Sequence, residues 1–303
     1  MKEERSFHQP SDSQSIFDWG GATHVGNIRT QNQDFFGTSN PLLAVADGMG
    51  GHNGGEIASE IAIKELLHNQ QFTTIQELAE QATKVNETVK TRAEENPVLF
   101  GMGTTLCALA YLPKSSKVGI INVGDSRIYI LAGQELHQIT QDHSLVEEMH
   151  REGKITKLEA QHHPHRNVIT RSIGTHDDVL VDFWEINPRE GDRFLLCTDG
   201  LTNELSDEEI KKILCEVSDP QKASEELIKN AISAEGLDNV TAVVVDIIEG
   251  KDQSSFLKIP KSPTTYRKDS FLLESPDPNV FQQSIKKLVS VIQKRWSMFT
   301  SQE

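Results

Sequence analysis

Acidic residues stand at the ends of short apolar runs that lie far apart in this 303-residue sequence. These residues are Asp47, Asp125, Asp199 and Asp238. Short apolar runs bounded by turn residues are typical of buried strands, so each aspartate is expected at a strand end. Carboxylates gathered there from distant parts of the chain indicate one shared site. Hard divalent cations such as Mg²⁺ and Mn²⁺ prefer carboxylate, carbonyl and water oxygens, so the pattern predicts a metal site.

The stretch LLAVADGMGGHNGGEIAS, residues 42–59, contains the first of these aspartates. An apolar run leads to Asp47, several glycines follow, and the sequence then becomes helical. Glycine lets the backbone come close to an ion or a phosphate. Asp47 could therefore bind a metal through its side chain and Gly48 through its carbonyl. For this stretch alone, a plain turn between a strand and a helix is the alternative.

The chain resembles the metal-dependent protein phosphatases of type 2C (PPM) in their bacterial form. Eight motifs occur in family order within about residues 15–249: RTQNQD (29–34), VADGMGG (45–51), GTT (103–105), VGDSR (123–127), DHS (142–144), NVITRSIG (167–174), TDG (198–200) and DNVT (238–241). Each motif is weak alone, but eight in order are specific. The resemblance implies a protein serine/threonine phosphatase that hydrolyses phosphoserine and phosphothreonine with a water activated by two metals, counteracting a kinase in signalling.

The resemblance also implies a set of metal ligands. Asp47 would bridge two Mg²⁺ or Mn²⁺ ions, and the Gly48 carbonyl would bind the second of them. Asp199 and Asp238 would complete the shell of the first, partly through water. Asp142 matches an aspartate that helps to bind a third, weaker metal in bacterial members.

Further roles are implied for residues that do not bind metal directly. Arg29 is expected to grip the substrate phosphate, because a guanidinium binds phosphate oxygens in a bidentate fork. Asp34 is expected to support a water at the metals. Two positions depart from the family: Gln33 replaces a common Glu, and Met49 stands where many eukaryotic relatives have a proton-donating histidine. His52 is the candidate general acid, with water at the metals as the alternative.

A non-catalytic binding module with this fold is the alternative function, and only the two departures favour it. Asn239 is expected to orient its loop and Asp238 rather than to bind metal.

Residues 144–176 are polar and poorly periodic, and the resemblance implies that they form a flap beside the active site. Three of its histidines, His162, His163 and His165, suggest zinc, but a loop leading into a short helix is the favoured interpretation.

Helical and strand patterns predict an α+β fold. Helices are expected at 55–69, 74–95, 207–216 and 221–235, with Thr74 and Glu77 at capping-box spacing. Strands are expected at 16–23, 42–46, 103–112, 117–122, 127–131, 135–139, 179–186, 193–197 and 240–248. Helices in blocks around runs of strands favour α+β over a doubly wound sheet. The resemblance implies a four-layer αββα sandwich of two antiparallel β-sheets flanked by paired helices, with the metals at one end.

The two ends of the chain are expected to lie outside the catalytic domain at 15–249. Residues 1–14 are polar, and residues 250–279 are rich in Ser, Thr, Pro and Lys, so both are predicted to be flexible. Residues 280–303 combine apolar residues at helical spacing with basic ones, which predicts a basic amphipathic helix. Through residues 280–299 it could contact a membrane surface, dock a partner or pack on the acidic domain.

Composition excludes several classes. A net charge of −15 argues against nucleic acid as the main partner, leaving phosphoproteins and a cognate serine/threonine kinase as the expected ones. Three scattered cysteines predict reduced thiols rather than disulfides. The sequence has no apolar signal region and no run of about 18 apolar residues, which predicts a cytoplasmic protein without a transmembrane span, peripheral to the membrane if its terminal helix binds there.

Overall fold

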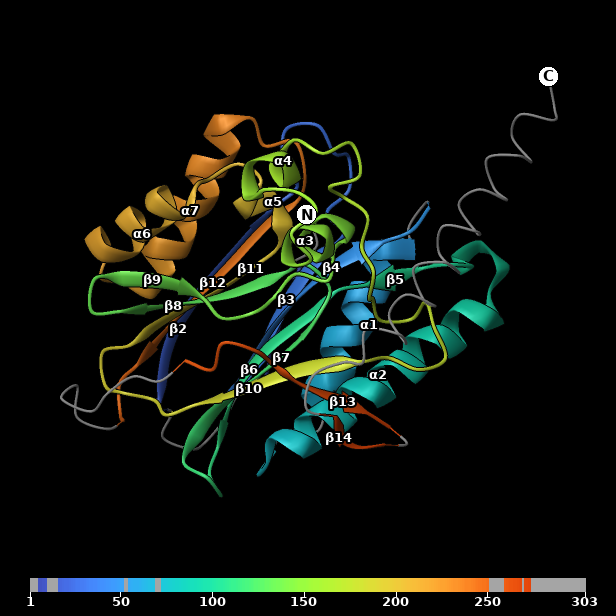
Figure 1. The fold of residues 1–303 in the computed structure, drawn as a ribbon, viewed down its shortest axis with the longest axis horizontal. Helices are drawn as coiled ribbons and strands as arrows, with labels where there is room; N and C mark the ends of the chain where they lie inside the picture. The colour runs from blue at the N-terminus through green and yellow to red at the C-terminus, as the bar shows by residue number, and fades with distance from the viewer. Residues whose placement is uncertain are drawn as a thin grey trace.

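The computed structural model describes residues 5–9, 16–51, 54–68, 72–250, 259–268 and 270–273. Two β-sheets pack face to face, and paired helices cover the outer face of each (Figure 1). This is the four-layer α+β arrangement expected from the sequence. Among the helices in these ranges, none is long and apolar enough to cross a membrane. His52 and the expected helix at 280–303 lie outside the described residues.

The first sheet is formed mainly by strands of the N-terminal half of the chain, with further strands added from the C-terminal half. Its order is β1 (Ser6–Gln9), β3 (Asp34–Ser39), β4 (Leu42–Met49), β6 (Leu106–Leu112), β7 (Lys117–Val123), β10 (Val181–Ile186), β13 (Thr264–Arg267) and β14 (Ser270–Leu273). The two-residue strand β5 (Gly103–Thr104) pairs with the end of β4. Neighbours are antiparallel, except that β1 runs parallel to β3.

The second sheet is antiparallel throughout. Its order is β2 (Phe17–His24), β12 (Val240–Ile247), β11 (Arg193–Cys197), β8 (Arg127–Ala132) and β9 (Glu135–Gln138). In this sheet β12 pairs with β2, so the last and the first strand of residues 15–249 are neighbours.

Figure 1 shows one helix pair on each outer side of the sandwich. The first sheet is covered by α1 (Gly54–His68) and α2 (Ile75–Glu95), and the second by α6 (Asp207–Glu216) and α7 (Pro220–Ala234). Thr74 and Glu77 form the predicted capping box at the start of α2. Shorter helical turns are η1 (Pro97–Leu99), α3 (Leu145–Arg151), α4 (Lys157–Gln161) and α5 (Asp199–Thr202).

Strand β4 shows why the run before Asp47 is continuously apolar. Leu42, Ala44 and Ala46 pack in the core beneath α1 and α2, whereas Leu43 and Val45 pack in the core between the sheets. Successive side chains of a strand point to opposite faces, so a strand with both faces buried has no polar side. The strand that carries Asp47 is therefore fixed in the centre of the sandwich.

Two segments predicted to be flexible contain strands. Within residues 1–14, β1 pairs with β3, and within residues 250–279, β13 and β14 extend the sheet beyond β10. Residues 6–9, 264–267 and 270–273 are therefore strands, which the sequence did not predict. These strands are stabilised by pairing with the edge strands of the sheet. Each has only four residues, which is too short to show a clear alternation of polar and apolar side chains.

Candidate active site

The strand-end aspartates meet with Asp34 at one end of the sandwich. Asp34 begins β3 and is the cross-strand partner of Asp47 at the end of β4. The other carboxylates interact electrostatically with this pair or with one another: Asp125, Asp199 and Asp238. One site therefore forms from β3, β4, the turn after β7, the start of α5 and the loop before β12.

Two threonines hold the backbone of Asp47. Its N–H donates to Thr105 Oγ1 at 2.8 Å, and its carbonyl accepts from Thr105 N at 2.9 Å and from Thr104 Oγ1 at 2.8 Å. The GTT motif therefore fixes the strand end from which the Asp47 side chain projects.

Gly48 is enclosed by backbone from two neighbouring segments. A Cβ at this position would lie 2.0 Å from the carbonyl oxygen of Gly55 and 2.7 Å from that of Gln33. The Gly48 N–H donates to the Gln33 carbonyl at 3.1 Å. Only glycine fits here without moving the backbone, since real Cβ atoms do not approach other atoms this closely.

Asp34 is fully buried between two hydroxyl donors. Its Oδ2 accepts from Thr198 at 2.8 Å and from Thr241 at 2.7 Å, while Oδ1 has no partner among the described residues. Burial raises the pKa of Asp34 to about 7 against the lowering effect of these two hydrogen bonds. An unpartnered buried carboxylate oxygen is costly, so it indicates that something else binds there.

The remaining carboxylates raise one another's pKa. Burial raises the pKa of Asp47 well above its ordinary value, and the charges of Asp34 and Asp199 raise it further. The pKa of Asp199 is raised by burial and then by Asp238. Part of the surface of both side chains still reaches solvent, so the group is open at its mouth. Such a cluster carries an excess of negative charge, which bound cations would balance.

Asp125 is the residue that the site assignment from sequence missed. It is 7% exposed, its Oδ1 has no partner among the described residues, and burial followed by the charge of Asp199 raises its pKa. Asp142, assigned to a third metal, has instead both oxygens occupied by Arg127, at 2.9 Å and 2.7 Å, and Oδ1 also by Gln138. The strand-end pattern did single out Asp125, but the resemblance directed the assignment to Asp142.

Arg29 lies at the open rim of the site. One of its terminal nitrogens is 2.7 Å from Asp238 Oδ2, and its side chain remains 55% exposed. The hydrogen bond that Arg29 donates to Asp238 raises the pKa of Arg29, and the charges of Asp47 and Asp199 add to this effect. A guanidinium is thus held beside the carboxylates with most of its surface facing solvent, where it could contact a phosphate.

Asn239 ties the loop that carries Arg29 to the loop that carries Asp238. Its Nδ2 donates to the carbonyls of Val25 and Gln31, both at 2.9 Å, and its Oδ1 accepts from Gln33 N at 2.7 Å. Its own N–H donates to Asp238 Oδ1 at 2.8 Å. The structure thus shows the orienting role expected for Asn239.

The histidine-rich segment lies in the described structure as a loop around α4. The His163 and His165 rings are 5.6 Å apart, and His163 Nδ1 accepts from the main-chain N–H of His165. Both the short turns α3 and α4 belong to residues 144–176. The bridge between Ile173 and Thr104 then joins the end of this segment to β5, beside Asp47.

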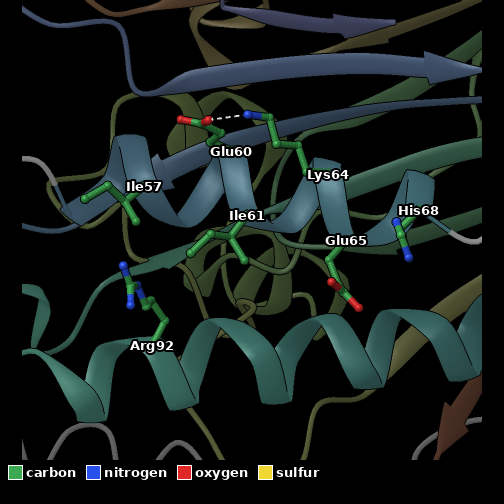
Figure 2. Close-up of a pocket in the computed structure, with 7 residues that line it drawn as sticks. All are labelled: Ile57, Glu60, Ile61, Lys64, Glu65, His68 and Arg92. Atoms are coloured by element: carbon green, nitrogen blue, oxygen red, sulfur yellow. Dashed lines mark hydrogen bonds and ion pairs between the residues drawn. The ribbon is translucent and has the colours of Figure 1, made fainter. Parts of the chain in front are cut away.

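A surface groove of about 490 Å³ lies elsewhere, between α1 and α2 (Figure 2). In Figure 2, Ile57 and Ile61 point from α1 towards α2, and Arg92 points back from α2. No carboxylate of the acidic site lines this groove. It is therefore a separate feature of the outer helical layer.

The donor set of the acidic site fits divalent cations bound through few protein ligands. Among the described residues, no three His, Cys, Asp or Glu side chains are grouped so that they could hold a metal ion by themselves. Mg²⁺ usually keeps several waters and takes one or two carboxylates, so an open cluster suits it. The unpartnered oxygens of Asp34 and Asp125, and the glycine-only backbone at Gly48, are the features that such ions would use.

Comparisons with known proteins agree with this geometry. A family model described as Protein phosphatase 2C matches residues 21–234. The chain is 38% identical over 238 residues to Protein phosphatase PhpP of Streptococcus pneumoniae, covering 75% of this chain and 96% of that protein. It is also 38% identical over 237 residues to Serine/threonine phosphatase stp of Listeria monocytogenes, covering 74% and 93%.

Solved structures show the same similarity. The serine/threonine phosphatase PstP/Ppp of Mycobacterium tuberculosis superposes with a TM-score of 0.73 at 36% identity, covering 77% of this chain and 99% of that one. The catalytic domain of PstP in complex with 2 manganese ions superposes with a TM-score of 0.70 at 35% identity, with the same two coverages.

Proposed function

Because this chain belongs to the protein phosphatase 2C family, we propose that its acidic site is the centre at which phosphoserine and phosphothreonine are hydrolysed. The protein is a metal-dependent serine/threonine protein phosphatase. The observation that carries the site assignment is the meeting of strand-end carboxylates with unpartnered oxygens, beside one solvent-facing guanidinium.

Two Mg²⁺ or Mn²⁺ ions would be held by the Asp47 carboxylate and the Gly48 carbonyl. Asp199 and Asp238 interact electrostatically with each other and would complete the shell of one ion, partly through water. Bound there, two such ions neutralise the charge of the phosphate and supply an activated water. Support for this arrangement comes from the manganese-bound PstP structure and from the fixed backbone of Asp47.

Asp34 and Arg29 are assigned separate roles, Asp34 towards the attacking water and Arg29 towards the phosphate. The buried Asp34 is held by Thr198 and Thr241 with one oxygen free to orient a water or take its proton. Arg29 would leave Asp238 for the phosphate oxygens, because a dianionic ester offers a guanidinium two acceptors in a fork. Its position at the rim allows this exchange without moving the sandwich.

A third, weaker metal is better assigned to Asp125 than to Asp142. The Asp142 carboxylate is occupied by the Arg127 guanidinium, whereas the buried Oδ1 of Asp125 has no hydrogen-bond partner in the described part of the chain, and Asp125 interacts electrostatically with Asp199. Met49 cannot donate a proton to the leaving group, and His52 stays the candidate general acid. The substrates proposed are phosphoproteins produced by a serine/threonine kinase, and a role of residues 280–299 in docking or membrane contact stays a prediction.

Asp47→Asn and Asp199→Asn test the assignment, with Asp18→Asn as the matched control. Asp18 is an exposed carboxylate on β2, outside the site. Turnover of a phosphothreonine peptide with Mn²⁺ should fall at least about 100-fold in both site variants and stay unchanged in the control. The Tm of the metal-free protein should not fall, because each site variant removes repulsion. Full Mn²⁺-dependent turnover in either site variant would refute the assignment.

A further inference from the structure

Strand β13 belongs to a part of the chain beyond the residues that the family model matches, 21–234. It pairs with β10, and Thr265 lies directly opposite Asp182. Thr265 Oγ1 donates to Asp182 Oδ1 at 2.7 Å, and both residues are almost fully buried. The extension therefore places a hydroxyl donor inside the protein rather than only covering a sheet edge.

Asp182 is a buried acceptor shared by three donors. Besides Thr265, Arg171 donates to Oδ1 at 2.9 Å and His143 Nε2 donates to Oδ2 at 3.0 Å. Burial raises the pKa of Asp182, but the contacts with His143, Arg171 and Thr265 outweigh this and lower it below its ordinary value. The carboxylate is thus ionised and depends on all three donors.

His143 connects Asp182 to the acidic site. Its Nδ1 accepts from the main-chain N–H of Gly124 at 3.0 Å, and the main-chain N–H of His143 donates to the Gly124 carbonyl at 2.9 Å. Gly124 has φ +115°, a conformation that other residues rarely adopt, and it directly precedes Asp125. His143 therefore fixes the turn at Gly124, from which the Asp125 carboxylate enters the acidic site.

The same histidine and arginine hold the end of the segment 144–176. The Thr170 N–H donates to the His143 carbonyl at 2.8 Å, and Arg171 follows in sequence with its guanidinium on Asp182. Ile173 then bridges to Thr104, whose hydroxyl donates to the Asp47 carbonyl. Asp182 is thus connected to the acidic site by two series of contacts. One runs through His143 to the turn before Asp125, and the other runs through Arg171 and Ile173 to Thr104 and Asp47.

We propose that Thr265 is a positioning residue, and that β13 acts as a latch which fixes the Asp125 turn and residues 170–173 through Asp182. The catalytic consequence rests on the proposed function, but the latch itself does not. Removing the hydroxyl leaves Asp182 Oδ1 with Arg171 alone. A hydrogen bond to a charged group is strong enough that its loss should increase the equilibrium constant for local opening of these segments about tenfold.

Three single substitutions in the full chain test the latch. Thr265→Val keeps the shape and removes the hydroxyl, and Thr265→Ser restores the hydroxyl. Thr264→Val is the matched control, since Thr264 is its neighbour on β13 and side chains of a strand alternate between faces. Amide hydrogen exchange is followed by mass spectrometry in the metal-free protein, and Mn²⁺ affinity by calorimetry.

Thr265→Val should exchange about tenfold faster in peptides covering 123–127 and 168–174, while α6 and α7 stay as in the wild type. The weakest Mn²⁺ site should lose severalfold in affinity, and Thr265→Ser and Thr264→Val should behave as the wild type.

Several outcomes would overturn the latch. Exchange in Thr265→Val equal to that in Thr264→Val would show that the Thr265 hydroxyl does not stabilise these segments. Faster exchange throughout the protein would make Thr265 a stability residue only. Faster local exchange with unchanged Mn²⁺ affinity would refute the connection to the acidic site. Failure of the proposed function would instead appear as active Asp47→Asn and Asp199→Asn variants, whatever the exchange results.

Discussion

Replacing Gly48 with alanine should disable the acidic site, whereas the same change at Gly51 should be harmless. Both glycines belong to the sequence GMGG at the end of β4. An added Cβ at Gly48 would lie 2.0 Å from the Gly55 oxygen, 2.4 Å from the Gly55 carbon and 2.7 Å from the Gln33 oxygen. An added Cβ at Gly51 would meet no atom of the described residues within 4 Å.

The size of the effect follows from the backbone shift that Gly48→Ala requires. Ordinary contacts of a Cβ begin at 3.4 Å, so β4 and the start of α1 must separate by more than 1 Å. Overpacking of this kind costs typically about 1–3 kcal/mol of stability. A displacement of about 1 Å at reacting groups lowers the rate by about 100-fold. The Gly48 carbonyl and the Asp47 carboxylate should both leave their positions for metal.

Mn²⁺-dependent turnover of p-nitrophenyl phosphate, Mn²⁺ binding by calorimetry and Tm are measured for both variants. Gly48→Ala should lose about 100-fold in turnover and bind Mn²⁺ more weakly, yet remain folded with a lower Tm. Gly51→Ala should match the wild type in all three. If Gly48→Ala bound Mn²⁺ and turned over substrate as well as Gly51→Ala does, the proposed use of the Gly48 backbone would be refuted.

Burial raises the pKa of Asp34 to about 7, so in the metal-free protein its stabilising proton is fully bound below about pH 4 and is lost as pH rises through 7. Asp34→Asn should therefore raise the Tm of metal-free protein by several degrees at about pH 8 and by clearly less at about pH 5; equal shifts at both would contradict this. Arg29→Ala should raise KM for a phosphothreonine peptide more than it lowers kcat, since the phosphate is present in ground and transition states, and a loss of kcat alone would exclude that role. Truncation after Leu273 should leave p-nitrophenyl phosphate turnover unchanged, whereas truncation after Gly250, which also removes β13 and β14, should lower Tm in a thermal melt.

The capping box at Thr74, the long helices and most strands of the sandwich could be predicted from the sequence. These features are local, since a capping box spans four residues and the alternation of a strand repeats every two. The short edge strands β1, β13 and β14 could not, because four residues carry little pattern and depend on an edge formed by distant strands.

The sequence by itself determined which residue types meet at the site. Aspartates at strand ends and the order of the motifs lead to Asp47, Asp199 and Asp238 without any coordinates, because strands of a sandwich end in common layers. The bulk composition likewise excluded nucleic acid as the expected main partner.

Only the tertiary structure decided which carboxylates are free. Asp142 is neutralised by Arg127, which lies 15 residues away, and Asp182 is completed by Thr265, which lies 83 residues away. Asp125 keeps an open oxygen because no such donor reaches it among the described residues. A hydrogen-bond partner is set by which strands become neighbours, and no local pattern around an aspartate encodes that choice.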